Sequence, residues 1–239
     1  LADAQAALFA DMGKAVGNEA LMDVFRVKYD YHNAKALVKA EALKLDQDRL
    51  LLGGGRYDPA VLAEGYRQED LRACSDTFQE AVAHAREVLG SSGDPQQADF
   101  ILDRAYFEEL SALAASSGSR FLEGYVSALI DGANLRAAVR SARLDKAGEF
   151  LRAVLVPGGT VATGAIASVK GAELGKVFKN TGFAAAAEAG AAVAVPNGGP
   201  LTEFERMCDD AVMAYLAKAR QIPFGEQPVV AYLYAREAE

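Results

Sequence analysis

Histidine and cysteine are scarce in this 239-residue sequence, which contains two residues of each type. His32 and His84 lie in different segments, whereas a zinc site needs about four convergent nitrogen or sulfur ligands. The two separated cysteines, Cys74 and Cys208, suit a reducing compartment better than a disulfide framework. The composition therefore predicts neither a metal site nor a scaffold held together by disulfides.

Long apolar runs and strand patterns are also missing. The most apolar stretch, Phe183 to Pro196, is rich in alanine, is broken by Glu188 and is too short to cross a bilayer. No signal peptide is visible. Alternating apolar and polar residues, which are typical of strands, do not occur. We therefore expect an all-α protein that is not itself membrane-spanning.

Basic residues are fewer than acidic residues, with 25 lysines and arginines against 33 aspartates and glutamates. The formal net charge is −8 and the sequence pI is about 5.0, which disfavours non-specific binding to nucleic acid. With half of the residues hydrophobic (51%) and a quarter charged (24%), the composition is that of an ordinary globular protein. We expect no nucleic-acid partner.

Catalytic motifs are absent as well. No GxSxG, HExxH or nucleotide-binding fingerprint occurs. Asp209-Asp210 resembles the start of the aspartate-rich motif of helical prenyl-transfer enzymes, but Met213 stands where a third acid is needed. The run Gly53 to Arg56 lacks the Gly-Lys-Ser/Thr ending of a phosphate loop and is better explained as a helix stop. We predict no catalytic residue, no cofactor and no metal site.

An internal repeat is the strongest positive signal. Residues 28–44 read KYDYHNAKALVKAEALK, and residues 130–143 read IDGANLRAAVRSAR. At one constant offset the aligned pairs are Asp30 with Asp131, Asn33 with Asn134, Lys35 with Arg136, Ala36 with Ala137, Val38 with Val139, and Lys39 with Arg140. Charge and polarity agree at all six positions, so we interpret the two segments as copies of one helical unit.

The spacing within the first copy predicts a helix with one apolar stripe, formed at steps of three and four residues by Val27, Tyr31, Ala34, Val38, Ala42 and Leu45. Asn33 and Asn134 are mediocre helix formers that compete for backbone hydrogen bonds. Because the same choice occurs in both copies, we expect each amide to bond a neighbouring helix or loop rather than to face solvent. Asp30, Asn33, Asp131 and Asn134 are therefore predicted to be structural residues of the repeat.

A basic stripe accompanies each motif and consists of Lys28, Lys35 and Lys39 in the first copy and of Arg136, Arg140 and Arg143 in the second. Two interpretations remain open at this point. The simpler one is a solvated helix face whose charges are offset by nearby acids. The other is a docking face for an acidic partner, where charge would steer association.

Glycine- and proline-rich segments suggest boundaries at residues 90–95 and 196–200. They predict three units: residues 1–92, a first helical repeat truncated at its N-terminus; 93–198, a second repeat; and 199–239, the start of a third unit cut short at its C-terminus. Within these units we expect a helix over residues 1–26 with a break near Gly17-Asn18 and a restart into Ala20–Phe25. We expect the first motif helix to run toward Leu52 and end at Gly53 to Gly55. Asp58-Pro59 and Asp94-Pro95 are predicted helix starts.

Four segments together resemble the C subunit of bacterial and archaeal V/A-type ATP synthases, whose family includes the d subunit of the vacuolar ATPase. They read FRVKYDYHNAKALVKA, LDRAYFEEL, IDGANLRAAVRSAR and PFGEQPVVAYLYAREAE, in the order of the family. The last is the most specific, and residues 160–195 match least well. In the family an asparagine and an arginine follow that last run, so we expect this chain to be a fragment lacking N- and C-terminal segments.

The resemblance implies an all-helical funnel of three domains with pseudo-threefold symmetry and no catalytic activity. Such a funnel caps the membrane rotor ring on the cytoplasmic side and receives the end of the central shaft. It transmits torque between ATP turnover and proton or sodium movement. On this interpretation the basic stripes are candidates to face the acidic tip of the shaft.

Two other functions remain as alternatives from the sequence. One is a helical-repeat scaffold or adaptor that binds a partner unrelated to rotary ATPases. The other is a helical enzyme whose pocket includes aspartate-bearing segments such as those of Asp103 and Asp209.

Overall fold

The computed structural model describes residues 12, 18–46, 50–145, 148–222 and 224–238, and all regular structure within these ranges is helical. The expectation of an all-α protein is therefore confirmed. The helix expected over residues 1–26 lies mostly outside the described residues. The chain separates into two compact units, Leu1–Gly118 and Ser119–Glu239, and each is described by itself.

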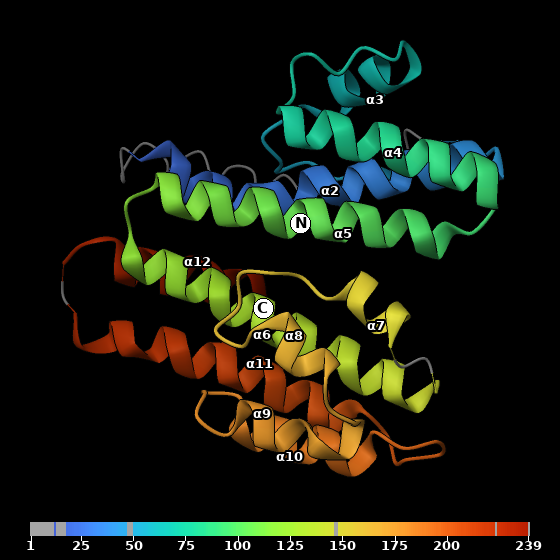
Figure 1. Cartoon of the computed structure of the whole chain (residues 1–239). Helices are drawn as coiled ribbons and strands as arrows, with labels where there is room; N and C mark the ends of the chain where they lie inside the picture. Colours follow the sequence, from blue (N-terminus) through green and yellow to red (C-terminus); the bar gives the residue numbers. More distant parts are fainter. Residues whose placement is uncertain (1–11, 13–17, 47–49, 146–147, 223, 239) are drawn as a thin grey trace. The chain divides into compact units, whose positions relative to one another are not determined.

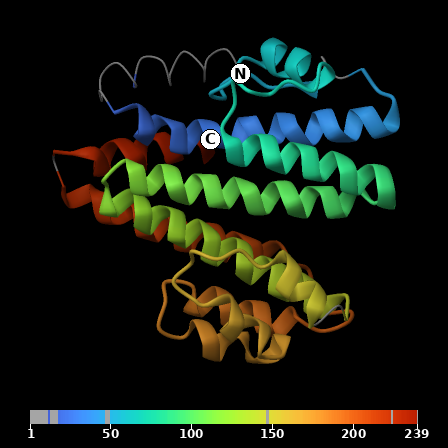
Figure 2. The same ribbon diagram turned by 45° about the horizontal axis from the view of Figure 1, so that its top comes forward.

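The described part of the first unit contains the helices α2 (Glu19–Leu43), α3 (Pro59–Arg67), α4 (Asp76–Ser92) and α5 (Pro95–Ser116). Helix α5 packs along both α2 and α4, and these three long helices lie side by side in both ribbon views (Figures 1 and 2). The short helix α3 packs against α2.

Polar caps begin all four of these helices. The side chains of Asn18, Asp58, Ser75 and Asp94 each accept a hydrogen bond from a backbone N–H in the first turn. Such a cap satisfies a donor that has no partner within its own helix. The two predicted Asp-Pro starts are therefore confirmed.

The end of α2 differs from the sequence expectation. The helix ends at Leu43, where Lys44 adopts a left-handed conformation (φ 55°) and returns its backbone N–H to Ala40 and Glu41. It therefore does not continue toward Leu52, and the prediction that Gly53 to Gly55 stop it is wrong. The physical reason is that the left-handed cap already satisfies carbonyl groups of the last turn.

Aromatic side chains fill the centre of the first unit. Tyr31 makes edge-on contacts with Phe78 and Tyr106, at centroid distances of 5.2 and 5.9 Å. The predicted apolar stripe is buried from Val27 through Tyr31 and Ala34 to Val38. Its last two members, Ala42 and Leu45, are exposed, because α2 ends there.

The second unit contains one long helix and several shorter ones. Its elements are α6 (Arg120–Arg143), α7 (Glu149–Val154), α8 (Thr163–Ala167), the 3₁₀ turn η2 (Gly171–Glu173), α9 (Leu174–Phe178), α10 (Ala184–Val193), α11 (Thr202–Leu216), η3 (Ala217–Gln221) and α12 (Glu226–Ala238). Helix α6 packs against α11, α10 and α12, and α10 lies along α9 (Figure 1).

Small residues permit this close packing. A Cβ atom at Gly190 of α10 would lie 2.8 Å from the Phe204 ring and 2.9 Å from Val139, so only glycine fits between α6 and α11.

Helix α12 buries Val230 and Leu233, whereas Tyr232 is half-exposed.

The compact units and the predicted repeat units divide the chain differently. Helix α5 belongs to the first compact unit, although residues 93–198 form the predicted second repeat. The division into three repeat units stays a prediction.

Candidate functional site

The asparagines of the motif helices hold the loops that follow them. The Asn33 amide donates to the Leu52 carbonyl (2.9 Å) and accepts from the Leu52 N–H (2.8 Å). Asn134 makes the same pair of bonds with Val156, at 2.7 and 2.8 Å. Both asparagines are buried. Each amide therefore satisfies both backbone groups of one loop residue.

The aspartates one turn earlier bind the same loops further along. Asp30 accepts from the Arg56 N–H at 2.9 Å and the Tyr57 N–H at 3.3 Å. Asp131 accepts from the Val161 N–H at 3.1 Å. Tyr57 lies five residues after Leu52, and Val161 lies five residues after Val156. The two copies of the motif thus bind their loops at matching positions.

A glycine lies against each aspartate. Cβ atoms at Gly55 and Gly159 would overlap the carboxylate oxygens of Asp30 and Asp131. Gly55 and Gly159 therefore let the backbone approach a buried carboxylate, and the run at 53–55 does not stop a helix as expected from the sequence. We call the Asp, the Asn and the loop that they hold the loop clamp of each unit.

The two clamps differ in how they compensate the buried carboxylate. In the first unit the guanidinium of Arg56 bonds Asp30 through Nε (2.6 Å) and Glu109 through Nη1 (2.8 Å). The Tyr31 hydroxyl donates to the other oxygen of Glu109 at 2.9 Å. In the second unit Thr160 stands at the position of Arg56, and its hydroxyl donates to Asp131.

Burial dominates the protonation equilibrium of Asp30. Its side chain is fully buried, and desolvation raises its pKa to about 6, although the bonds from Arg56 oppose that rise. The pKa of Tyr31 is raised by burial and by the neighbouring Glu109 carboxylate, so its hydroxyl stays a donor. Arg56 remains a cation, because its two carboxylate partners raise its pKa despite burial.

Most cations of the basic stripes lie close to acids or carbonyls of their own unit. Lys35 pairs with Asp103, and Lys39 pairs with Asp99 at 2.7 Å, so both bridge α2 to α5. Lys28 lies 4.9 Å from the centre of the Tyr29 ring.

The second stripe repeats this pattern between α6 and α11. Arg136 pairs with Asp209, and Arg140 pairs with Glu205 at 2.6 Å. Arg143 donates to the carbonyls of Gly198 and Gly199. Asp103 and Asp209, the aspartates of the enzyme alternative, are thus ion-pair partners of the motif helices in separate units.

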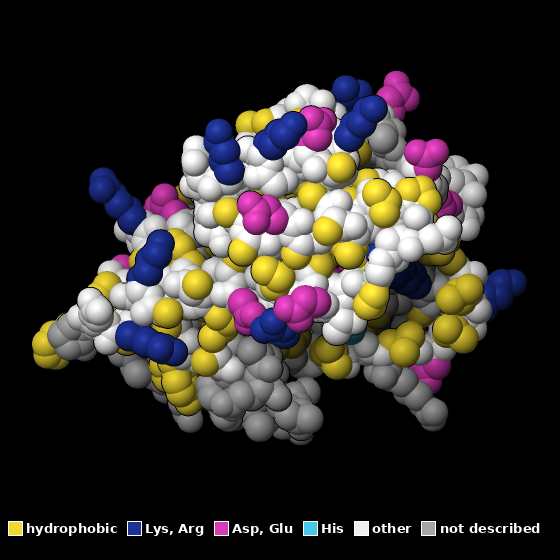
Figure 3. Space-filling view, turned by 90° about the horizontal axis from the view of Figure 1, so that it is seen from below, with side chains coloured by type: hydrophobic (Ala, Val, Ile, Leu, Met, Phe, Trp, Pro, Cys, Tyr) yellow, Lys and Arg dark blue, Asp and Glu magenta, His cyan; other side chains and the backbone are white. Residues whose placement is uncertain are grey.

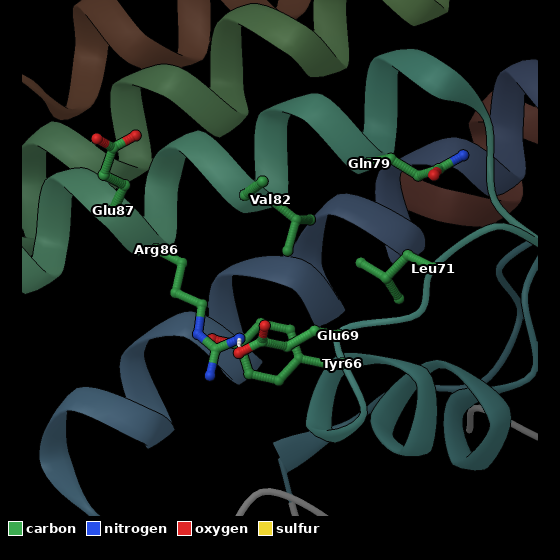
Figure 4. A pocket seen from close by; sticks show the side chains of 8 residues that line it. Tyr66, Glu69, Leu71, Gln79, Val82, Arg86 and Glu87 are labelled. Carbon is green, nitrogen blue, oxygen red and sulfur yellow. Dashed lines mark hydrogen bonds and ion pairs between the residues drawn. The ribbon is translucent and has the colours of Figure 1, made fainter.

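On the face shown in Figure 3, lysines, arginines and carboxylates are interspersed, and hydrophobic side chains are scattered between them. A groove of about 500 Å³ lies beside α4, and Figure 4 shows its lining. There the Arg86 guanidinium lies over the Tyr66 ring (5.1 Å) and pairs with Glu69 (2.9 Å) and Glu41. Because these charges compensate one another, we interpret the groove as a junction between α4 and the loop after α3.

The remaining candidate residues offer no reactive group. Burial raises the pKa values of Cys74 and Cys208 to about 11, so both thiols stay protonated. Among the described residues, no group of histidines, cysteines and acids could hold a metal ion. Within that same part of the chain, none of the helices combines the length and the apolar character that crossing a membrane requires.

Sequence reasoning identified the motif aspartates and asparagines but missed Arg56, Tyr31 and Glu109. Arg56 was interpreted as part of a helix stop, and Tyr31 only as a core residue. One signal was available: Gly-Gly-Arg (residues 54–56) and Gly-Gly-Thr (158–160) follow the two motif helices at similar distances.

Comparisons with known proteins all find C subunits of V-type ATPases and ATP synthases. Over 239 residues the chain is 23% identical to the C subunit of the V-type sodium ATPase of Enterococcus hirae, and the match covers all of this chain and 73% of that protein. Over 142 residues it is 26% identical to the C subunit of the V-type ATP synthase of two Thermus thermophilus strains, covering 57% of this chain and 44% of those proteins. The family model of the ATP synthase (C/AC39) subunit matches residues 3–239. Since that match spans nearly the whole chain, the protein belongs to the ATP synthase (C/AC39) subunit family, whose members are non-catalytic subunits of their complex.

Proposed function

We propose that this chain is the central-stalk subunit of a V/A-type rotary ATPase. In this proposal it lies at the cytoplasmic face of the membrane and joins the central shaft to the membrane rotor ring. It transmits torque while ATP turnover drives, or is driven by, proton or sodium transport. The observation that carries the proposal is the family match over residues 3–239.

The geometry is compatible with such a mechanical function. A torque coupler must resist deformation, and each described unit fixes its loop to a long helix through buried polar contacts. We also propose that the two clamps belong to copies of one helical unit, and that residues 199–239 begin a third copy. This arrangement would give the three-domain funnel that the sequence resemblance implies.

The association is tested by affinity purification of the tagged full protein from solubilised membranes. Recovery of the other rotary ATPase subunits is expected. Recovery of an unrelated partner without any of those subunits would contradict the proposal and favour the scaffold alternative.

Coupling is tested in proteoliposomes that contain the rotary complex, depleted of this protein and then supplied with it again. We expect ATP-driven ion uptake to require the protein, while ATP hydrolysis by the catalytic head continues without it. Equal uptake with and without the protein would exclude a coupling function.

The basic stripes remain candidates for contact with an acidic shaft tip, in addition to their ion pairs. Reversing Lys35 and Arg136 together (Lys35→Glu, Arg136→Glu) should uncouple hydrolysis from transport if the proposal is right. The same reversal also breaks two internal ion pairs, so a control must separate the two effects.

Charge swaps provide that control. Lys35→Asp with Asp103→Lys, combined with Arg136→Asp and Asp209→Arg, keeps both internal pairs possible but reverses the charges on the motif helices. If the stripes grip the shaft, the swapped protein should fold normally and still fail to couple. Normal coupling in the swapped protein would assign the stripes to internal pairing alone.

A further inference from the structure

The second unit contains a cavity of about 660 Å³ whose lining includes Asp131 and Thr160 of the loop clamp. Its other walls are largely apolar and include Val161, Phe183, Ala211 and Tyr215. Asp131 is 1% exposed. A buried carboxylate beside an apolar cavity is unusual, because burying a charge without a paired cation is costly.

The polar partners of Asp131 are neutral. Its carboxylate accepts from the Thr160 hydroxyl and the Val161 N–H. Among the described residues that line the cavity, Lys218 is the one cation, but its ammonium lies over the Tyr215 ring, 4.5 Å from the centroid, and forms no ion pair with Asp131. In the part of the chain that the structure describes, Asp131 therefore borders the cavity as an almost completely buried side chain with no cation bound to it.

In the first unit, the region beside Asp30 corresponds to the cavity beside Asp131. The ion pairs set the register, because Lys35 with Asp103 corresponds to Arg136 with Asp209. In this register Tyr31 and Glu109 correspond to Gly132 and Tyr215. The loop bonds to the two aspartates, from Tyr57 and Val161, set Arg56 against Thr160.

Two of these replacements remove bulk from this region, since threonine and glycine are smaller than arginine and tyrosine, and the third replaces the Glu109 carboxylate by the neutral but larger Tyr215 side chain. In the first unit the Arg56 guanidinium fills this region and bonds the aspartate of the clamp at 2.6 Å. In the second unit the shorter Thr160 replaces that arginine, and the aspartate remains. Phe183 fills only the space beside Gly132, with its ring 3.2 Å from where a Cβ would lie. The rest of this region in the second unit is the cavity.

We propose that this cavity receives the guanidinium of an arginine side chain from a partner protein, which binds Asp131 as Arg56 binds Asp30. The apolar walls would cover the aliphatic part of that side chain, and the carboxylate would accept from its N–H groups. Arginine fits better than lysine because its planar group donates several bonds at once and is more weakly hydrated. The rotary coupling function is not needed for this inference.

The probe is Nα-acetyl-arginine methylamide, which mimics an arginine within a chain, and the control is its neutral analogue built on citrulline. Binding is followed by NMR of methyl-labelled alanine and threonine in the full protein. We expect saturable shifts at Thr160, Ala165 and Ala211, which line the cavity, and binding at least about tenfold weaker for the citrulline analogue. Equal binding of both compounds, or no binding of either, would overturn the proposal.

Two variants test the assignment to Asp131. Asp131→Asn should weaken binding of the arginine probe at least about tenfold. Thr160→Arg places a guanidinium at the position of Arg56, so it should occupy the cavity from within and abolish binding while the protein stays folded. If Asp131→Asn does not fold, Thr160→Arg still decides, because undiminished binding to that variant contradicts the proposal.

Free arginine separates a protein partner from a small molecule. Its carboxylate and amino group are absent from a residue within a chain, so the blocked probe should bind at least as tightly. Clearly tighter binding of free arginine would replace the proposed protein partner by an amino-acid ligand.

Discussion

Arg56 and Thr160 occupy matching positions, but they bond the buried aspartate of their unit with different groups. Arg56 supplies a cation to both Asp30 and Glu109, whereas Thr160 supplies a neutral hydroxyl to Asp131. One atom of the first network remains unsatisfied, since Arg56 Nη2 is buried without a hydrogen-bond partner among the described residues. The first unit therefore depends on an ion network whose central arginine the second unit replaces by threonine.

Replacing Arg56 by methionine should strongly destabilise the protein. The change keeps a long apolar side chain but leaves Asp30 and Glu109 buried without their cation. Breaking one side of a buried pair costs about 3–5 kcal/mol. Urea unfolding measures the change, with Lys35→Met as a control, because its ion pair is partly exposed and should contribute less than about 1 kcal/mol. Equal losses in both variants would contradict the importance of this network.

Stability should also depend on the protonation of Asp30. Its pKa is about 6 in the folded protein and 3.8 for an ordinary aspartate, so the folded state binds more protons between these values. The free energy of unfolding should then fall as pH rises from about 4 to about 6, by at most about 3 kcal/mol. Asp30→Asn should lack this component. Urea unfolding at several pH values measures the free energy of unfolding of both proteins. The value for the original protein minus the value for Asp30→Asn should fall as pH rises, and a rise in this difference would contradict the prediction.

At the scale of elements, each motif helix controls the loop that follows it. The clamp contacts join residues 19 apart in the first unit and 22 apart in the second. Both loops therefore return along their helix, and the two arrangements use the same residue types. This correspondence makes paired mutations informative.

Asn33→Ala and Asn134→Ala should have similar effects. Each substitution leaves one loop N–H and one loop carbonyl without the amide that satisfied them, and unsatisfied buried groups cost about 1–3 kcal/mol each. Hydrogen exchange should become faster at Leu52 in the first variant and at Val156 in the second. Unaffected exchange at the corresponding loop residue would show that the amide does not hold the loop.

Alanine at Gly55 or Gly159 should displace the loop from its aspartate. A methyl group at either site would overlap the Asp30 or Asp131 carboxylate, and overpacking in a buried site typically costs about 1–3 kcal/mol. Gly53→Ala and Gly164→Ala are matched controls, because among the described residues no atom lies within 4 Å of a Cβ at either position. In thermal unfolding, the Tm should fall for the variants at Gly55 and Gly159 and should change little for the two controls.

At the scale of the whole molecule, each compact unit has buried packing of its own. The aromatic contacts of Tyr31 lie within the first unit, and the packing of α6 with α10 and α11 lies within the second. Family membership agrees with the predicted absence of catalytic function.

We expect residues 1–118 and 119–239 to fold when expressed separately. Each unit should keep a helical circular dichroism spectrum and a cooperative thermal transition, because its long helices are covered by helices of the same unit. A fragment that is helical only in the presence of the other would show that the cores depend on each other.

Local interactions made part of this structure predictable. Helix starts at Asp58 and Asp94 depend on a cap that bonds the next few residues, and the buried stripe of α2 follows from a period of 3.6 residues. The matching aspartates and asparagines of residues 28–44 and 130–143 were also visible, because they need only two aligned segments of sequence.

Contacts between distant residues decided the rest. The glycines at 53–55 resemble a helix stop in sequence, but Gly55 lies against Asp30, 25 positions earlier, and the helix ends at Leu43 with Lys44 as its cap. Arg56 gains its importance only because folding brings Asp30 and Glu109 to its guanidinium. The sequence by itself determined the helices and their shared motif, since their signals act within a few residues. Only the tertiary structure decided which charges pair, where the loops are held and where a cavity remains, because those depend on side chains that are far apart along the chain.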